Sequence, residues 1–180
     1  MLDFSRNHFD LFGLPARFRL DAAALEAAWR RLQSQVHPDR HAAGSDADRR
    51  AALQASARVN EAYRTLREPV GRAEYLLALR GIEALRETDT ALPMDFLERQ
   101  LERREDAADA AAARDAAALR AVQDEVHAEA RALETALAAQ IDDAGDHGGA
   151  RMRVRELRFL HKVGEDLAAV EQALDEPVDG

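Results

Sequence analysis

Three consecutive residues, His37, Pro38 and Asp39, combine side chains that could do chemistry or contact a partner. The imidazole can donate or accept a hydrogen bond, the carboxylate carries a charge, and the proline fixes its own φ and has no N–H to donate. They lie in a polar segment between two predicted helices. A rigid polar tip of this kind is suited to a partner surface rather than to catalysis.

Other patterns that could support chemistry are weak. The chain has no glycine-rich phosphate loop, no Gly-x-Ser-x-Gly elbow, no His-Glu-x-x-His pair and no cysteine. His161 and Glu165 stand four residues apart and could in principle ligate a metal, although a surface pair on a helix is the simpler interpretation. We therefore predict no catalytic residue, no metal site, no cofactor and no enzymatic activity.

The elements around the triplet are predicted to be two antiparallel helices. Apolar residues spaced by four, three and four form a stripe on a helix that follows an N-cap at Asp21. Pro38 ends that helix, and Ser45 with Asp48 forms a capping-box pattern that starts a second one, running to about Arg67. The residues expected to face inward are Leu25, Trp29, Leu32 and Val36 on the first helix and Leu53, Val59, Tyr63 and Leu66 on the second.

Shorter helices are expected on either side of this pair, around residues 6–11 and over 72–80. Residues 1–80 therefore form a first predicted domain. The stretch 82–92 has no clear hydrophobic period, so residues 81–92 are predicted to be a linker.

Residues 93–180 are predicted to form an antiparallel three-helix bundle. Asp95 and Glu98 resemble a capping box that opens a helix to about Asp106, and a bend is expected within the alanine-rich stretch 107–118. A heptad-like helix follows, then a turn over residues 145–149 and a last helix over 151–174. The leucines assigned to the core are Leu133, Leu137, Leu157 and Leu160.

Composition and charge narrow the class of protein. The 180 residues are 47% hydrophobic and 33% charged, and helix formers dominate, which favours a fold of the all-α class. Residues 1–80 carry 13 Arg and 10 Asp or Glu, whereas residues 81–180 carry 12 Arg or Lys and 24 Asp or Glu. A net charge of −9 argues against a nucleic-acid partner. The apolar runs are too short to span a membrane, and the first residues do not resemble a signal peptide.

The first eighty residues resemble a J-domain, and the whole chain resembles the HscB family of J-domain co-chaperones. The matching motifs are Leu11-Phe12-Gly13-Leu14-Pro15-Ala16-Arg17, His37-Pro38-Asp39, Arg72-Ala73-Glu74-Tyr75-Leu76-Leu77 and Leu157-Arg158-Phe159-Leu160. The resemblance implies a bacterial, cytoplasmic co-chaperone of iron–sulfur cluster assembly. Its expected partners are HscA, a DnaK-type chaperone whose ATPase the J-domain stimulates, and IscU, the scaffold protein held by the bundle.

The resemblance also implies two sets of binding residues. The chaperone-binding set is His37, Pro38 and Asp39 in the ATPase-stimulating loop, with Arg30 and Arg31 on the preceding helix. The scaffold-binding set is Leu97, Leu101, Glu102, Glu105 and Phe159. Two positions depart from the family pattern: Val36 replaces the tyrosine common before the triplet, and Glu98 replaces a residue that is usually apolar.

The residues themselves leave alternatives open. Phe159 lies about 75° from the centre of its helix's apolar stripe, so it and Leu101 could form an interface core or simply close the bundle. A general J-protein that delivers unfolded clients is the alternative function. A purely structural helical adaptor is the third hypothesis, although such a protein would not need the His-Pro-Asp loop.

Overall fold

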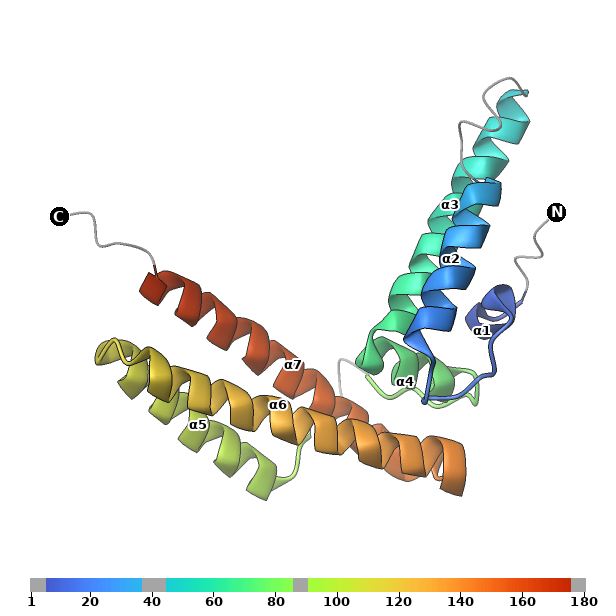
Figure 1. Ribbon diagram of the computed structural model, residues 1–180. Coiled ribbons are helices and arrows are strands. Elements are labelled where there is room, and N and C mark those ends of the chain that lie inside the picture. Colours follow the sequence, from blue (N-terminus) through green and yellow to red (C-terminus); the bar gives the residue numbers. More distant parts are fainter. Residues whose placement is uncertain (1–5, 37–44, 86–90, 176–180) are drawn as a thin grey trace. The chain divides into compact units, whose positions relative to one another are not determined.

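The computed structural model describes residues 6–36, 45–85 and 91–175, and every regular element in those ranges is helical (Figure 1). The chain divides into two compact units, Met1–Gly81 and Ile82–Gly180, which we call the hairpin unit and the bundle unit. No helix in the described ranges has both the length and the apolar character to cross a membrane. The all-α fold predicted from the sequence is confirmed.

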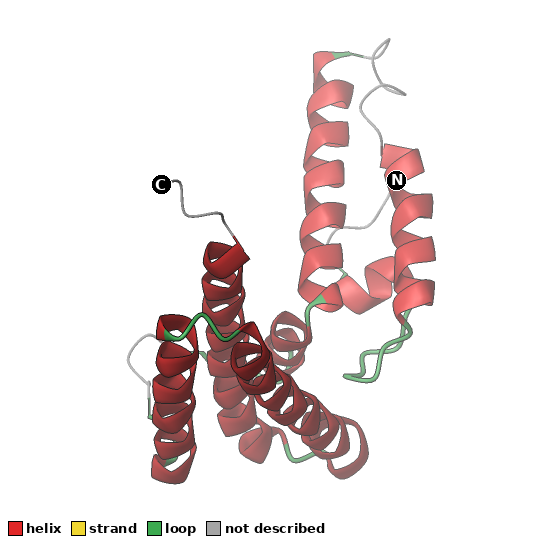
Figure 2. Cartoon of the chain, turned by 60° about the vertical axis from the view of Figure 1, so that its left-hand side comes forward, coloured by secondary structure: helices red, strands yellow, loops and turns green. Residues whose placement is uncertain are grey.

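The hairpin unit contains α1 (His8–Phe12), α2 (Ala22–Val36), α3 (Asp46–Arg67) and α4 (Pro69–Ala78). Helices α2 and α3 lie side by side, with α1 packed against both and α4 against α3 (Figures 1 and 2). Leu25, Leu32 and Val36 of the predicted stripe are buried, as the spacing requires.

Alanine, rather than leucine, forms much of the face that α3 turns to the core. The buried residues of α3 are Ala52, Ala55, Val59, Ala62 and Leu66. Small side chains at these positions let the helix axes approach closely. The prediction that Leu53 faces inward is wrong, because its side chain is 56% exposed. Leu53 stands six residues before Val59, a separation that places the two on different faces of a helix.

Trp29 and Tyr63, which we expected to face inward, lie half-buried at the edge of the hairpin. Their rings stack with centroids 4.7 Å apart and an interplanar angle of 21°. The indole Nε1 of Trp29 donates a hydrogen bond to Oδ1 of Asn60 at 3.0 Å. The stacked rings join α2 to α3 at this edge, and the indole of Trp29 keeps its polar atom paired.

The caps that the sequence predicts for the hairpin are confirmed. Oδ1 of Asp21 accepts hydrogen bonds from two first-turn amides of α2, at 2.9 and 3.0 Å. At the start of α3, Oγ of Ser45 accepts from the amide of Asp48 at 3.2 Å, and the Asp48 carboxylate accepts from the Ser45 amide at 3.0 Å. These caps fix where α2 and α3 begin, and the Ser45 cap marks the point at which the chain re-enters the hairpin after the segment between the two helices.

Aromatic contacts attach the short helices. The imidazole of His8 stacks on the ring of Tyr75 with centroids 4.1 Å apart, and the Tyr75 hydroxyl accepts a hydrogen bond from the His8 amide at 3.0 Å. Burial and the nearby Arg58 lower the pKa of His8. Gly13 ends α1 with φ of 69°, a left-handed conformation that glycine adopts without strain.

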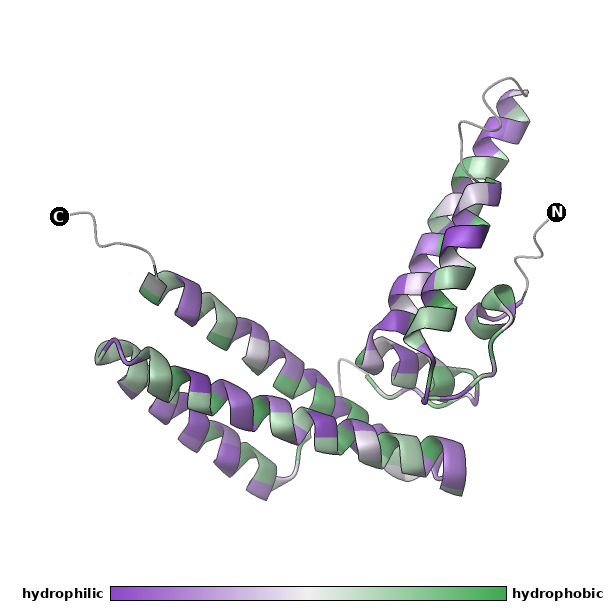
Figure 3. Cartoon of the chain, in the orientation of Figure 1, coloured by the Kyte–Doolittle hydropathy of each residue, from purple (hydrophilic) through white to green (hydrophobic). Residues whose placement is uncertain are grey.

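The bundle unit contains α5 (Met94–Ala112), α6 (Ala116–Ala138), a π-helical stretch η2 (Ala139–Ala144) and α7 (His147–Asp175). Helix α6 packs against both α5 and α7. Each of these helices carries both hydrophilic and hydrophobic residues along its length (Figure 3). Leu137, Leu157 and Leu160 lie in the core as predicted. The core assignment of Leu133 is wrong, because its side chain is only half-buried.

Both turns of the bundle differ in detail from the predictions. The expected bend in the alanine-rich stretch is a chain reversal after Ala112, where Arg114 has φ of 52° and the Asp115 carboxylate caps α6. The second turn is confined to the residues around Gly145, whose φ is 65°. Helix α7 begins at His147, earlier than expected, because the Asp146 carboxylate accepts a hydrogen bond from the Gly149 amide at 2.9 Å.

The beginning of the predicted linker is part of the bundle unit. Ala84 is 1% exposed, and its carbonyl accepts a hydrogen bond from Nε of Arg155, itself buried on α7, at 2.9 Å. An arginine is seldom buried without such a partner. The chain is therefore attached to α7 at Ala84, which the absence of a hydrophobic period in this stretch did not reveal.

Candidate functional site

Helix α5 begins without the predicted capping box. Its N-cap is Pro93, and no side chain accepts a hydrogen bond from the first turn. The Asp95 carboxylate instead accepts one from Nη1 of Arg99 at 3.2 Å, because the four-residue spacing brings the two side chains together. Glu98 consequently has no capping role and stays exposed on the helix surface.

A cluster of ionic contacts fixes how α5 is rotated on α6. Nη2 of Arg99 lies 3.1 Å from Oε1 of Glu129, and Nη1 of Arg103 pairs with the other carboxylate oxygen. Burial alone would raise the pKa of Glu129, but the hydrogen bonds from Arg103 and Arg99 outweigh it and hold that pKa below its ordinary value. With these arginines directed at α6, the opposite face of α5 is left to solvent.

The predicted scaffold-binding residues of α5 all lie on that exposed face. Leu97 is 37% exposed and Leu101 is 57% exposed, and Glu102 and Glu105 are exposed beside them. A leucine more than half exposed contributes little to a bundle core. The interface interpretation therefore fits Leu101 better than the alternative in which it closes the bundle.

Phe159, the predicted scaffold-binding residue on α7, contacts α5 through Phe96. Its ring meets Phe96 edge to face, with centroids 5.6 Å apart and an interplanar angle of 78°. Phe96 is 1% exposed and Phe159 is half-buried, so Phe159 packs against the first turns of α5 and still presents part of its ring. Glu156 lies one turn earlier on α7, and burial raises its pKa against the opposing effect of Arg153.

Sequence reasoning missed one residue of this face and one buried residue that supports the site. Met94 is 71% exposed, the largest exposed fraction among the big apolar side chains of the described ranges. Its spacing of three and seven residues from Leu97 and Leu101 was the available signal, but its place directly after the predicted linker concealed it. Phe96 was the other omission, since only the fold reveals that it supports Phe159.

The chaperone-binding residues fall in and before the segment between α2 and α3. His37, Pro38 and Asp39 lie outside the described residues. Arg30 and Arg31 are exposed on α2, and Nη2 of Arg30 pairs with the Glu26 carboxylate at 2.5 Å. Val36, by contrast, is 6% exposed. Its side chain belongs to the core of the hairpin and is not available to a partner.

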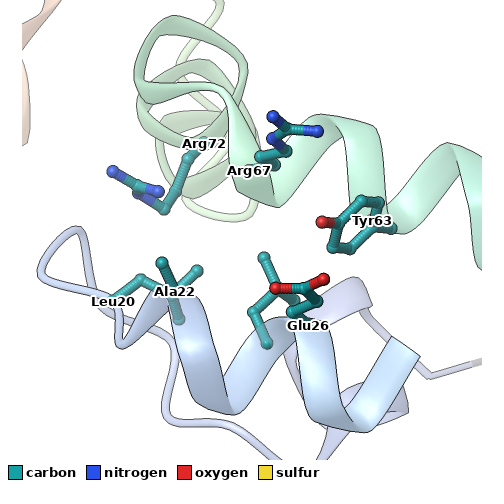
Figure 4. Close-up of a pocket in the computed structure, with 7 residues that line it drawn as sticks. Leu20, Ala22, Glu26, Tyr63, Arg67 and Arg72 are labelled. Atoms are coloured by element: carbon teal, nitrogen blue, oxygen red, sulfur yellow. The ribbon is translucent and has the colours of Figure 1, made fainter. Parts of the chain in front are cut away.

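A hollow of about 290 Å³ lies at the other end of the hairpin (Figure 4). Its lining residues are Leu20, Ala22, Leu25, Glu26, Tyr63, Arg67 and Arg72. Arg72 is held there by its own packing, with its guanidinium 4.9 Å from the Phe18 ring centroid and Nη1 donating to the Leu66 carbonyl at 2.8 Å. The hollow is formed by the first turns of α2, the last turns of α3 and Arg72 of α4, and it adjoins the predicted chaperone-binding residues through the ion pair between Glu26 and Arg30.

Comparisons with known proteins cover almost the whole chain. Residues 92–168 match the family model described as the HSCB C-terminal oligomerisation domain. The co-chaperone protein HscB homolog of Burkholderia multivorans is 47% identical over 175 residues, covering 97% of this chain and 99% of that protein. The corresponding homolog of Ralstonia nicotianae is 48% identical over 172 residues, covering 96% and 98%.

The solved structures agree with these relatives. Chaperone HscB from Vibrio cholerae superimposes with a TM-score of 0.83 at 38% identity, covering 94% of this chain and 99% of that one. This match extends over both units of the chain, so the hairpin unit is a J-domain and the bundle unit is the helical C-terminal bundle that follows it. The chain belongs to the HscB family of co-chaperones.

Proposed function

We propose that this co-chaperone stimulates the ATPase of HscA, a DnaK-type chaperone, and delivers the scaffold protein IscU to it during iron–sulfur cluster assembly. The observation that carries the proposal is the exposed, acid-edged apolar face of α5. It occurs in a chain that also has the His-Pro-Asp triplet and belongs to the HscB family. The protein itself supplies no catalytic group in this scheme.

The two halves of the chain have different tasks in this proposal. His37, Pro38 and Asp39 contact the chaperone and trigger hydrolysis, while the arginines of α2 approach an acidic chaperone surface. The face of α5, together with Phe159, holds the scaffold. Because both partners are bound by one chain, the scaffold is kept at a high effective concentration near the chaperone's peptide-binding site.

The alternative, a general J-protein for unfolded clients, is less well supported. Such a protein would expose a broad apolar surface, since unfolded chains offer no fixed complementary shape. In the described ranges five large apolar side chains are exposed, and three of them lie on the first two turns of α5. A compact apolar patch with an acidic edge suits a single folded partner.

An ATPase assay with and without scaffold separates the hypotheses. Stimulation of the chaperone that increases further when IscU is added supports the proposal. Stimulation that IscU leaves unchanged but unfolded proteins increase would favour the general J-protein. An absence of stimulation under all conditions would reject both and leave a structural adaptor.

Chaperone stimulation should weaken as salt is added, through Arg30 and Arg31. Both guanidinium groups are exposed, and screening shortens the range of charge attraction from about 10 Å at 0.1 M salt. The Arg30→Ala/Arg31→Ala chain should show weaker stimulation and a flatter salt dependence in steady-state ATPase assays. Arg104→Ala, which removes an exposed arginine of the bundle unit, is the matched control and should behave like the parent. A salt dependence unchanged in the double variant would contradict this role.

A further inference from the structure

The exposed face of α5 carries two parallel rows of side chains. At about 100° per residue, Met94 and Leu101 lie about 20° apart around the helix axis, with Leu97 beside them. These three form an apolar row, and they are 71%, 57% and 37% exposed. A second row, of carboxylates, begins about one turn further along the helix, and its centre lies about 70° around the axis from the centre of the first. Its members are Glu98, Glu102 and Glu105.

The carboxylate row is left without cationic partners. None of its three glutamates forms an ion pair within the part of the chain that the structure describes, although Asp95 on the same helix pairs with Arg99. Like charges spaced three and four residues apart on a helix destabilise it by a few tenths of a kcal/mol per pair. The chain has many arginines, yet within the described residues none of them pairs with this row. The row is therefore suited to a partner that supplies the cations.

We infer that the scaffold-binding surface of this protein begins at Met94 and that Glu98 is part of its acidic row. The partner therefore presents an apolar strip beside a row of basic side chains. Met94 supplies the apolar contact that the usual apolar residue at position 98 would give, displaced by one turn. The inference deepens the proposed function and rests on it.

The arrangement also gives the surface a direction. Exposed apolar side chains are concentrated on the first two turns of α5, which Phe159 contacts through Phe96, and an apolar interface core typically supplies most of the affinity. The carboxylates border one side of the apolar row, whereas the exposed Arg104 lies on its other side. A partner with a basic row on one side only can therefore dock in one orientation along α5.

Calorimetry of the full-length chain with purified cognate IscU tests the inference. Met94→Ala should weaken binding about tenfold and leave the melting temperature unchanged, because the side chain is exposed and alanine favours helix. Glu98→Gln should weaken binding about threefold at low salt and not at high salt, with a shallower dependence of affinity on salt. Leu53→Ala, an exposed leucine of the hairpin unit, is the matched control and should bind like the parent.

Leu101→Ala, measured in the same series, separates this inference from the proposed function. If it weakens binding while Met94→Ala does not, the extended apolar row is wrong and the proposed function stands. If neither truncation changes the affinity, the scaffold-binding role of α5 falls as well. A Glu98→Gln chain that binds IscU as tightly as the parent at low salt would overturn the acidic row.

Discussion

Replacing His37 with glutamine is expected to abolish stimulation of the chaperone's ATPase while the chain stays folded. His37 follows the last residue of α2 in the sequence and belongs to neither predicted apolar stripe, so we expect the substitution to leave the core intact. Glutamine keeps hydrogen-bonding capacity and similar size but lacks the imidazole ring. Single-turnover ATP hydrolysis with the cognate HscA should fall to the basal rate of the chaperone alone.

Circular dichroism and IscU binding provide the controls for this variant. Both should match the parent, because the bundle unit is untouched by the substitution. A folded His37→Gln chain that still stimulates hydrolysis fully would end the assignment of the triplet as the stimulating loop. Loss of stimulation accompanied by loss of helicity would point to a structural role for His37 instead.

Truncating Leu97, Leu101 and Phe159 together to alanine should reduce the affinity for IscU by about a hundredfold or more. Each anchor residue of an interface typically contributes about 2 kcal/mol or more to binding, and these contributions are not additive. Stability should change little by comparison. Leu97 and Leu101 are exposed and Phe159 is half-buried, so we expect a loss of about 2 kcal/mol, against 2–5 kcal/mol for each leucine of a true core. Calorimetric titration and thermal melting measure the two effects.

The control for the triple variant removes the two exposed leucines of the hairpin unit, Leu53 and Leu79, which are 56% and 43% exposed. That Leu53→Ala/Leu79→Ala chain should bind IscU normally. The triple variant should also retain chaperone stimulation measured without scaffold. A large fall in melting temperature, with IscU affinity preserved at low temperature, would mean that these residues close the bundle rather than bind a partner.

The general architecture follows from patterns that are strong in the sequence. Capping residues such as Asp21 and Ser45 specify where helices begin, because their side chains must accept hydrogen bonds from the first-turn amides. Regular apolar spacing specifies which face is buried, as it does for Leu25, Leu32 and Val36. These signals are local, so they can be detected without knowledge of the fold.

One error was avoidable from the sequence: Leu53 was expected inside because it is apolar, but its separation of six residues from Val59 places it on another face of α3. Other errors arise where a tertiary contact outweighs a local pattern. Asp95 and Glu98 have the spacing of a capping box, yet Arg99 offers Asp95 a salt bridge in its place. The carbonyl of the buried Ala84 accepts a hydrogen bond from Arg155, which is 71 residues away in the chain, a separation over which no periodicity applies.

The candidate site was likewise only partly predictable from the sequence. Leu97, Leu101 and Phe159 were identified through family motifs, whereas Met94 was not, because its exposure depends on how α5 is rotated on α6. That rotation is fixed by Arg99, Arg103 and Glu129, whose pairing is set by the bundle. Such side chains become functional candidates only when the fold shows which face they leave open.

The central claim is that one chain binds the scaffold and the chaperone at the same time. It is tested most directly by single-turnover ATP hydrolysis with HscA and IscU, comparing the parent with an equimolar mixture of two defective chains. One chain carries His37→Gln and the other carries the Leu97→Ala/Leu101→Ala/Phe159→Ala truncations. The account predicts that the parent and IscU together increase the rate of hydrolysis by more than the sum of the increases that each gives alone. The mixture should give only that sum, because neither defective chain links the two partners. A mixture that restores the full synergy of the parent would contradict the account.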